Sequence, residues 1–136
     1  SNCPCKYCSI YTKMGKNLRI FALRETESDP YVALMTPWSL VHFLSGAAAK
    51  QVSMPLSWFF MLHGAYEVKD QIIRETGDVY NSAVNSVGDQ TVAVLGHILT
   101  PSLGVGSLFS KPFVLAFAGS LIIGWVLEDT VPDLIG

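Results

Sequence analysis

Four ionisable side chains in the middle of the chain have the spacing of one helix face. They follow the intervals i, i+4, i+7 and i+11 and are His63, Glu67, Asp70 and Arg74. Side chains at these intervals lie on the same side of an α-helix. Ionisable groups beside an apolar helical segment are costly unless they face a bundle interior and pair there. We therefore interpret this face as a candidate ligand-binding site, with ordinary solvation of its C-terminal half as the alternative.

A second polar group begins the next predicted helix. It contains Ser82, Asn85, Ser86 and Asp89. Asp89 is the only formal charge between Val79 and Ser110, about two turns into that helix. A carboxylate in such a place needs a partner or tends to stay protonated. The alternative is that these residues cap the helix N-terminus, where Asn, Ser and Asp are favoured.

The histidines add a further constellation. His42 lies in a predicted first helix and His97 late in the third, and a lone helical histidine is more often a hydrogen-bonded packing residue than a ligand. Polar groups on three helices can nevertheless converge in a small bundle, here His42, His63, Glu67 and Asp89. Nitrogen and oxygen ligands of this kind suit zinc or a similar ion. No HExxH-type spacing supports such a site, so the sequence alone predicts no cofactor.

Three cysteines lie at the start of the chain, in the pattern C-P-C-x-x-C. As thiolates, Cys3, Cys5 and Cys8 lack the fourth ligand of a closed zinc site. The alternatives are S-acylation, which would add a membrane anchor, a disulfide with one thiol left over, or free thiols. The pattern does not decide among these.

The composition points to the elements that would carry these residues. Of 136 residues, 50% are hydrophobic and 15% are charged, against roughly 25% in an average soluble domain. Such a composition excludes a disordered or fibrous chain. Residues 31–49, 51–66, 90–110 and 112–127 carry no formal charge, and about 20 apolar residues span a bilayer. We therefore predict an all-α, polytopic membrane four-helix bundle, with a soluble helical protein of unusually apolar core as the alternative.

Turn and cap residues give the approximate boundaries of this bundle. The four helices are expected at about 36–50, 55–75, 82–99 and 111–129, and residues 31–35 would add to the apolar depth of the first. Residues 1–30 would form a separate cysteine-bearing tail. It would contain a basic amphipathic helix, whose apolar positions are Ile10, Met14, Leu18 and Phe21. Residues 31–136 would form the transmembrane domain.

The distribution of lysine and arginine predicts an orientation. If all four helices span, seven basic residues fall on the side of both termini and two on the other side. The chain would then be an integral membrane protein with both termini on the cytoplasmic-equivalent side. The expected partners are the lipid bilayer and other protein subunits, and nucleic acid is not expected.

Three segments resemble the VanZ-like family and its small four-helix membrane relatives. They are W-S-L-V-H-F in the first helix, A-Y-E-V in the second and Y-N-S-A-V-N-S-V-G-D at the start of the third, within residues 36–100. The matching positions are His42, Glu67, Ser82, Asn85, Ser86 and Asp89. The resemblance implies a four-helix membrane fold with a buried His/Glu/Asn/Asp cluster.

These observations lead to two predicted functions. The first is a structural or assembly subunit of a larger membrane-associated complex, because small-residue helix faces permit close packing and little chain lies outside the helices. The second is a membrane-embedded protein that binds a lipid or amphiphile, with Glu67 and Asp89 as ligand or acid–base groups and Arg74 at an anionic headgroup. No phosphate-binding loop, dinucleotide fingerprint or hydrolase signature is present. Enzymatic activity therefore stays uncertain, and we favour a role without catalysis.

Overall fold

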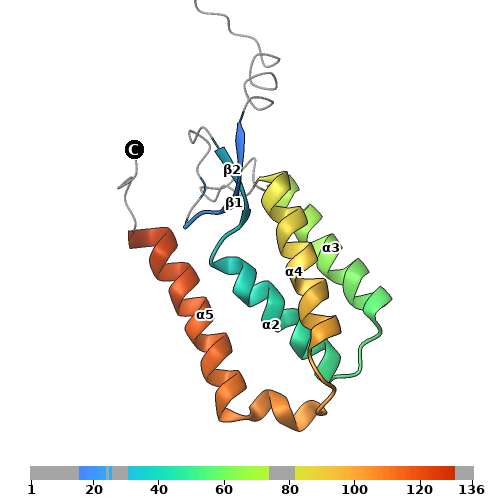
Figure 1. Ribbon diagram of the computed structural model, residues 1–136. Coiled ribbons are helices and arrows are strands. Elements are labelled where there is room, and N and C mark those ends of the chain that lie inside the picture. The colour runs from blue at the N-terminus through green and yellow to red at the C-terminus, as the bar shows by residue number, and fades with distance from the viewer. Residues whose placement is uncertain (1–15, 24, 26–30, 74–81, 131–136) are drawn as a thin grey trace, which may run out of the picture.

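A computed structural model describes residues 16–23, 25, 31–73 and 82–130 (Figure 1). Four α-helices dominate the described part, as the sequence predicted. In chain order the elements are β1 (Asn17–Phe21), β2 (Tyr31–Met35), α2 (Trp38–Gln51), α3 (Leu56–Ile73), α4 (Ala83–Leu99), the 3-10 helix η2 (Val105–Phe109) and α5 (Lys111–Thr130). In Figure 1, α2 lies between α5 on one side and α4 on the other, and the two strands lie at the N-terminal end of α2.

The two strands correct the predicted secondary structure before α2. β1 pairs with β2 in parallel, with Asn17 opposite Tyr31 and Phe21 opposite Met35. Residues 17–21 are therefore not part of an amphipathic helix, and residues 31–35 do not lengthen the first helix. Tyr and Val favour strands, and Pro37 disfavours helical backbone at the residue before it, so α2 begins only at Trp38. Any helix between residues 10 and 15, like the cysteine tail, lies outside the described residues.

The membrane prediction is also wrong. Within the described ranges, no helix is long and apolar enough to cross a membrane. α2 has 14 residues, which is about 21 Å of helix, whereas the hydrocarbon core is about 30 Å thick. The C-terminal half of α3 carries Glu67, Lys69 and Asp70, and α5 has charged residues in its first and last turns. The transmembrane, multi-pass and integral-membrane predictions are therefore wrong, and so is the predicted orientation of the termini.

α2 and α4 approach one another at backbone distance. A Cβ atom on Gly46 of α2 would clash with the carbonyl of Ala93, and one on Gly96 of α4 would clash with the carbonyl of Phe43. A third glycine, Gly88, brings α4 equally close to the backbone of β2. These contacts fix α4 against both α2 and β2, and so fix the position of every side chain that α4 presents.

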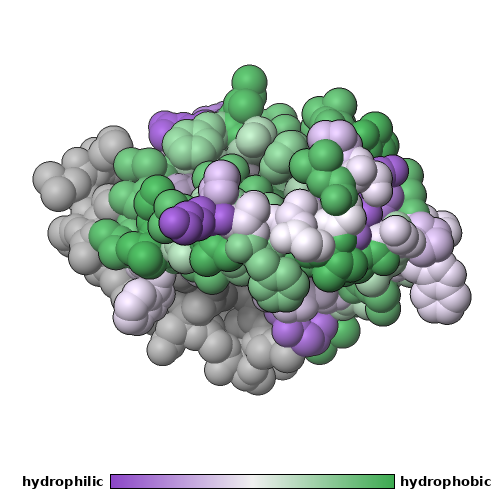
Figure 2. Space-filling view, turned by 90° about the horizontal axis from the view of Figure 1, so that it is seen from below, coloured by the Kyte–Doolittle hydropathy of each residue, from purple (hydrophilic) through white to green (hydrophobic). Residues whose placement is uncertain are grey.

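The interior of the described bundle is small and unusually polar. Its buried apolar side chains are mainly alanines together with Phe59, and buried polar side chains outnumber them. Many large apolar side chains are exposed instead, among them Trp58 on α3 and Leu115 and Trp125 on α5. Hydrophobic residues cover much of the face seen in Figure 2. The described part therefore buries its polar groups and leaves much of its apolar surface outside.

The close helix crossing gives a first prediction. We expect Gly96→Ala to lower the free energy of unfolding by about 1–3 kcal/mol or more, because the new methyl group has no room against α2. Gly119→Ala in α5 is the matched control, since a Cβ there meets nothing within 4 Å and alanine favours helix by up to about 1 kcal/mol. Urea denaturation of both variants measures the difference. Equal effects of the two substitutions would contradict the proposed backbone contact.

Candidate functional site

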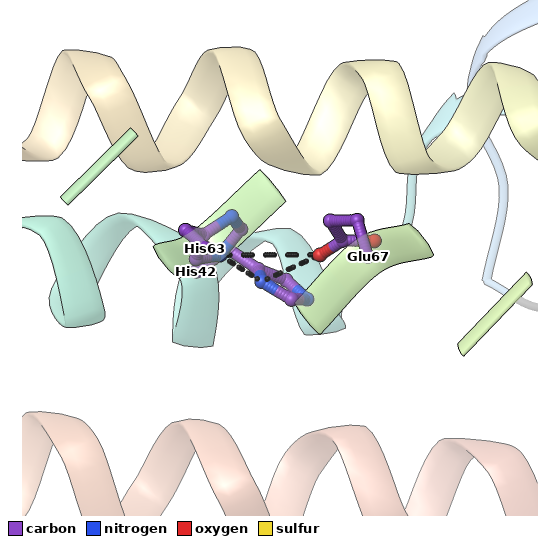
Figure 3. Close-up of side chains that lie close together, drawn as sticks. All are labelled: His42, His63 and Glu67. Carbon is purple, nitrogen blue, oxygen red and sulfur yellow. Dashed lines mark hydrogen bonds and ion pairs between the residues drawn. The ribbon is translucent and has the colours of Figure 1, made fainter. Parts of the chain in front are cut away.

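Three side chains from two helices point toward a common centre (Figure 3). His42 comes from α2, and His63 and Glu67 lie one turn apart on α3. His42 Nδ1 is 2.9 Å from His63 Nε2 and 3.4 Å from Glu67 Oε1, and His63 Nε2 is 3.9 Å from the same oxygen. The sequence predicted the α3 pair from its i, i+4 spacing. The sequence also suggested that His42 could converge with them, and the packing of α2 against the bundle places it there.

α4 supplies an outer partner for each of these three side chains. Ser86, Asp89 and Gln90 lie on one face of α4, at the intervals i, i+3 and i+4. Asp89 lies beside His42, Gln90 binds His63, and Ser86 binds Glu67. One helix thus orients the whole central group, which we call the His42–His63–Glu67 cluster.

The hydrogen bonds of Gln90 fix the tautomer of His63. The Gln90 amide nitrogen donates to the Phe60 carbonyl at 3.2 Å, so its oxygen faces His63. That oxygen only accepts, so His63 Nδ1 donates to it across 2.7 Å. In the neutral ring Nε2 then carries no proton. The lone pair of His63 Nε2 is therefore directed into the cluster before any ligand binds.

Glu67 presents an unsatisfied oxygen to the same centre. The residue is 5% exposed, and its Oε1 atom has no hydrogen-bond partner among the described residues. Ser86 also bonds to this carboxylate and must reach the other oxygen, while Ser86 Oγ itself accepts from Gln71 at 2.8 Å. Burial raises the pKa of Glu67, and the Ser86 hydrogen bond and nearby His63 oppose that rise. A buried carboxylate oxygen without a partner is costly and suggests a missing ligand.

His42 and Asp89 form the second buried acid–base pair. His42 Nε2 is 3.5 Å from Asp89 Oδ2, and Asp89 Oδ1 accepts a 2.5 Å hydrogen bond from the Ser39 hydroxyl. Burial, reinforced by His63, lowers the pKa of His42 to about 4. Burial also raises the pKa of Asp89 to about 7, against the stabilising Ser39 hydrogen bond. Without a further positive charge, this pair holds its proton on the carboxyl group rather than on the ring.

The geometry of the cluster matches that of metal ligands. Four ligands arranged tetrahedrally at 2.0–2.1 Å around zinc are separated from one another by about 3.4 Å. The three donor–donor separations in the cluster, 2.9, 3.4 and 3.9 Å, are centred on this value. The three donor atoms lie within 4.8 Å of one another, so one ion can contact all of them after small side-chain adjustments. The cluster can therefore hold a divalent cation through two imidazoles and one carboxylate oxygen.

The remaining candidates from the sequence fall outside this cluster. Ser82 caps α4 by accepting from the Asn85 amide, and the Asn85 side chain donates to the Leu34 carbonyl. Asp70 lies one turn beyond Glu67 and pairs with Lys69 at 3.1 Å. The third histidine, His97, is hydrogen-bonded to the Met54 carbonyl, as expected of a packing residue. Arg74, Cys3, Cys5 and Cys8 lie outside the described residues.

Sequence reasoning missed several residues that orient the site. Gln90 and Ser39 touch the cluster or its outer partner, and neither was singled out. The i, i+3, i+4 spacing of Ser86, Asp89 and Gln90 was a usable signal for one polar face. Glu25 gave no such signal, because its carboxylate binds groups far away in sequence: the Ala33 amide of β2, and both the amide and the hydroxyl of Ser82.

The buried carboxyl of Asp89 predicts a pH-dependent stability. Its pKa rises from 3.8 to about 7 on folding, so the folded chain binds the extra proton between these values. The contribution of Asp89 to stability is therefore lost as pH rises from about 4 to about 7. An asparagine mimics the neutral carboxyl and avoids this loss. We expect Asp89→Asn to gain on the order of 2–4 kcal/mol relative to the unsubstituted protein between pH 4 and pH 8.

Urea denaturation in the presence of a chelator, at several pH values, measures this gain. Asp70→Asn is the matched control, because its carboxyl is about one-third exposed. A stability difference between the Asp89→Asn and unsubstituted proteins that stays constant with pH would show that folding does not raise the pKa of Asp89.

Comparison with known proteins adds no family to this picture. No protein-family model matches the chain, and neither does any curated protein or solved structure. The resemblance to the VanZ-like family therefore stays a prediction, based on the three segments quoted above.

Proposed function

We propose that this protein binds one divalent transition-metal ion, with zinc preferred, through His42 Nδ1, His63 Nε2 and Glu67 Oε1. The observation that carries the proposal is the convergence of these three donors, one of which is a buried carboxylate oxygen with no described hydrogen-bond partner. Buried polar atoms are almost always satisfied, and an absent ion is one accepted reason for an exception.

The charge of the site supports a dication. Glu67 and Asp89 are both buried, and no lysine or arginine in the described part of the chain pairs with either of them. Two ionised carboxylates and one divalent ion sum to zero. Bound metal therefore removes the electrostatic cost that protons would otherwise have to offset.

The donor set and spacing support zinc over a harder ion. Imidazole nitrogens suit zinc and its first-row neighbours, whereas magnesium and calcium prefer oxygen ligands alone. Adjacent ligands in an octahedral magnesium site lie about 3.0 Å apart. Two of the three separations here are longer, at 3.4 and 3.9 Å. These longer separations favour tetrahedral coordination, in which the ligand–metal–ligand angles are wider than in an octahedral site.

The outer partners are those of a metal site. Metal-bound histidines usually donate their second N–H to a carboxylate or carbonyl group, which fixes the tautomer and makes the ligand more basic. His63 already donates to Gln90, and His42 has Asp89 beside its second nitrogen. An ion at His42 Nδ1 leaves the ring proton on Nε2, where the Asp89 carboxylate accepts it.

A role in a larger assembly stays a second prediction. One observation is consistent with it, namely the exposed large apolar side chains of α3 and α5. Apolar surface of this kind marks interaction sites in many proteins. The metal site would add to such a role by linking α2 to α3, which otherwise meet mainly through α4.

Metal analysis tests the proposed function directly. We expect the protein to retain one zinc ion per chain after chelator treatment, reloading and gel filtration, and to unfold at a higher temperature when loaded. His63→Ala should abolish retention because it removes a donor atom, and Glu67→Gln because it replaces an anionic oxygen donor with a neutral amide oxygen, which is a poor ligand for zinc. Asp89→Asn should weaken zinc affinity by about 10–100-fold, because it removes only an outer partner.

Asp70→Asn is the control for this experiment. It makes the same carboxylate-to-amide change as Glu67→Gln, on the same helix but at a residue that supplies no donor atom, and the protein should still retain one zinc ion per chain. Zinc retention by the Glu67→Gln protein at the level of the Asp70→Asn protein would refute the proposed site. So would a chain that takes up no divalent transition metal at all.

A further inference from the structure

The number of donors in the cluster bears on the kind of metal site it forms. Within the ranges that the structure describes, His42, His63 and Glu67 are the one group of histidine, cysteine and acidic side chains that converges on a point. Structural zinc sites have four protein ligands, whereas catalytic ones have three and keep the fourth position for water or substrate. A three-donor site is therefore of the open type unless a neighbour supplies a fourth ligand.

Two polar neighbours on α4 are placed where they cannot supply it. Asp89 lies beside Nε2 of His42, whereas the donor atom of that ring is Nδ1, which points away from Nε2. Gln90 is likewise bonded to Nδ1 of His63, whereas Nε2 is its donor. Both residues thus lie behind the rings, as seen from the ion.

The hydrogen bond with Ser86 orients Glu67 to bind an ion through one oxygen. Its second carboxylate oxygen takes part in the hydrogen bond with Ser86, which in turn accepts from Gln71. This chain holds the carboxylate with one oxygen toward the ion. The described residues therefore provide three donor atoms and three outer partners, with one partner for each ligand.

The side of the cluster formed by His42 is the more accessible one. The His42 side chain is 16% exposed, whereas those of His63 and Glu67 are 8% and 6% exposed. α4 lies behind the ligands with the three outer partners, one of which, Asp89, is beside His42 itself. Of the three ligands, His42 is therefore the one beside which solvent comes nearest to the cluster.

We infer that the metal ion keeps one coordination position open to water or a small anion, so that the His42–His63–Glu67 cluster is a ligand-binding centre rather than a closed structural one. This inference rests on the proposed function. It adds the class of ligand, an anionic oxygen or nitrogen donor small enough to pass His42. A water molecule bound at such a position is acidified by the ion, as in zinc sites that activate water.

Cobalt substitution tests the open position, because the visible spectrum of Co²⁺ reports its coordination. The full chain is loaded with Co²⁺, freed of excess ion by gel filtration and titrated with azide, which serves as the small-anion probe. We expect a saturable change in the absorption bands that fits one site per chain. The cobalt content should be unchanged after the titration.

The result separates this inference from the proposed function. A chain that binds no Co²⁺ would refute the metal site itself. If the chain binds one Co²⁺ but its absorption bands do not change at any azide concentration, all coordination positions of the ion are occupied. That result would overturn only the open position. His63→Ala is the control, since its spectrum should show neither the protein-bound bands nor a response to azide.

Discussion

The structure depends on how four titratable side chains are neutralised inside a small bundle. Glu67, Asp89, His42 and His63 are packed together, and no lysine or arginine of the described chain pairs with the two acids. In a medium of low polarity such groups need protons, hydrogen bonds or a cation. The raised pKa values of both acids and the lowered pKa of His42 are the cost of this arrangement without an ion. A divalent ion removes that cost for both acids at once.

The glycines of α2 and α4 make this arrangement possible. Because Gly46 and Gly96 let the two backbones touch, α4 comes close enough for Asp89 to lie beside His42 and to accept from Ser39, both on α2. Glu25 then holds the N-terminus of α4 against the strands through Ser82. The close packing of glycines between α2 and α4 therefore also orients the side chains of the site. The apolar side chains that this core cannot accommodate lie on the outside (Figure 2).

Several features were predictable because they depend on neighbours close in sequence. The helices α3, α4 and α5 begin and end near their predicted boundaries, where proline, serine and glycine interrupt the apolar segments. His63 and Glu67 share a helix face because one turn separates them. The strands were missed because a parallel pair joins residues about 14 positions apart, and no local pattern encodes such a pairing. The membrane spans were wrong because uncharged windows were counted as helix, although α2 has only 14 residues and β2 takes part of its window.

The sequence by itself determined a mostly helical chain, poor in charge, whose few buried acids and histidines had to find partners. It also determined which pairs lie on one helix face, because helical periodicity is a local property. Only the tertiary structure decided that His42 joins His63 and Glu67, that Asp89 lies beside His42, and that Gln90 sets the tautomer of His63. Those contacts join residues 21 to 47 positions apart, across helices whose approach is set by the steric fit of glycines. A metal site of this kind exists only where that fit brings its donor atoms to one point.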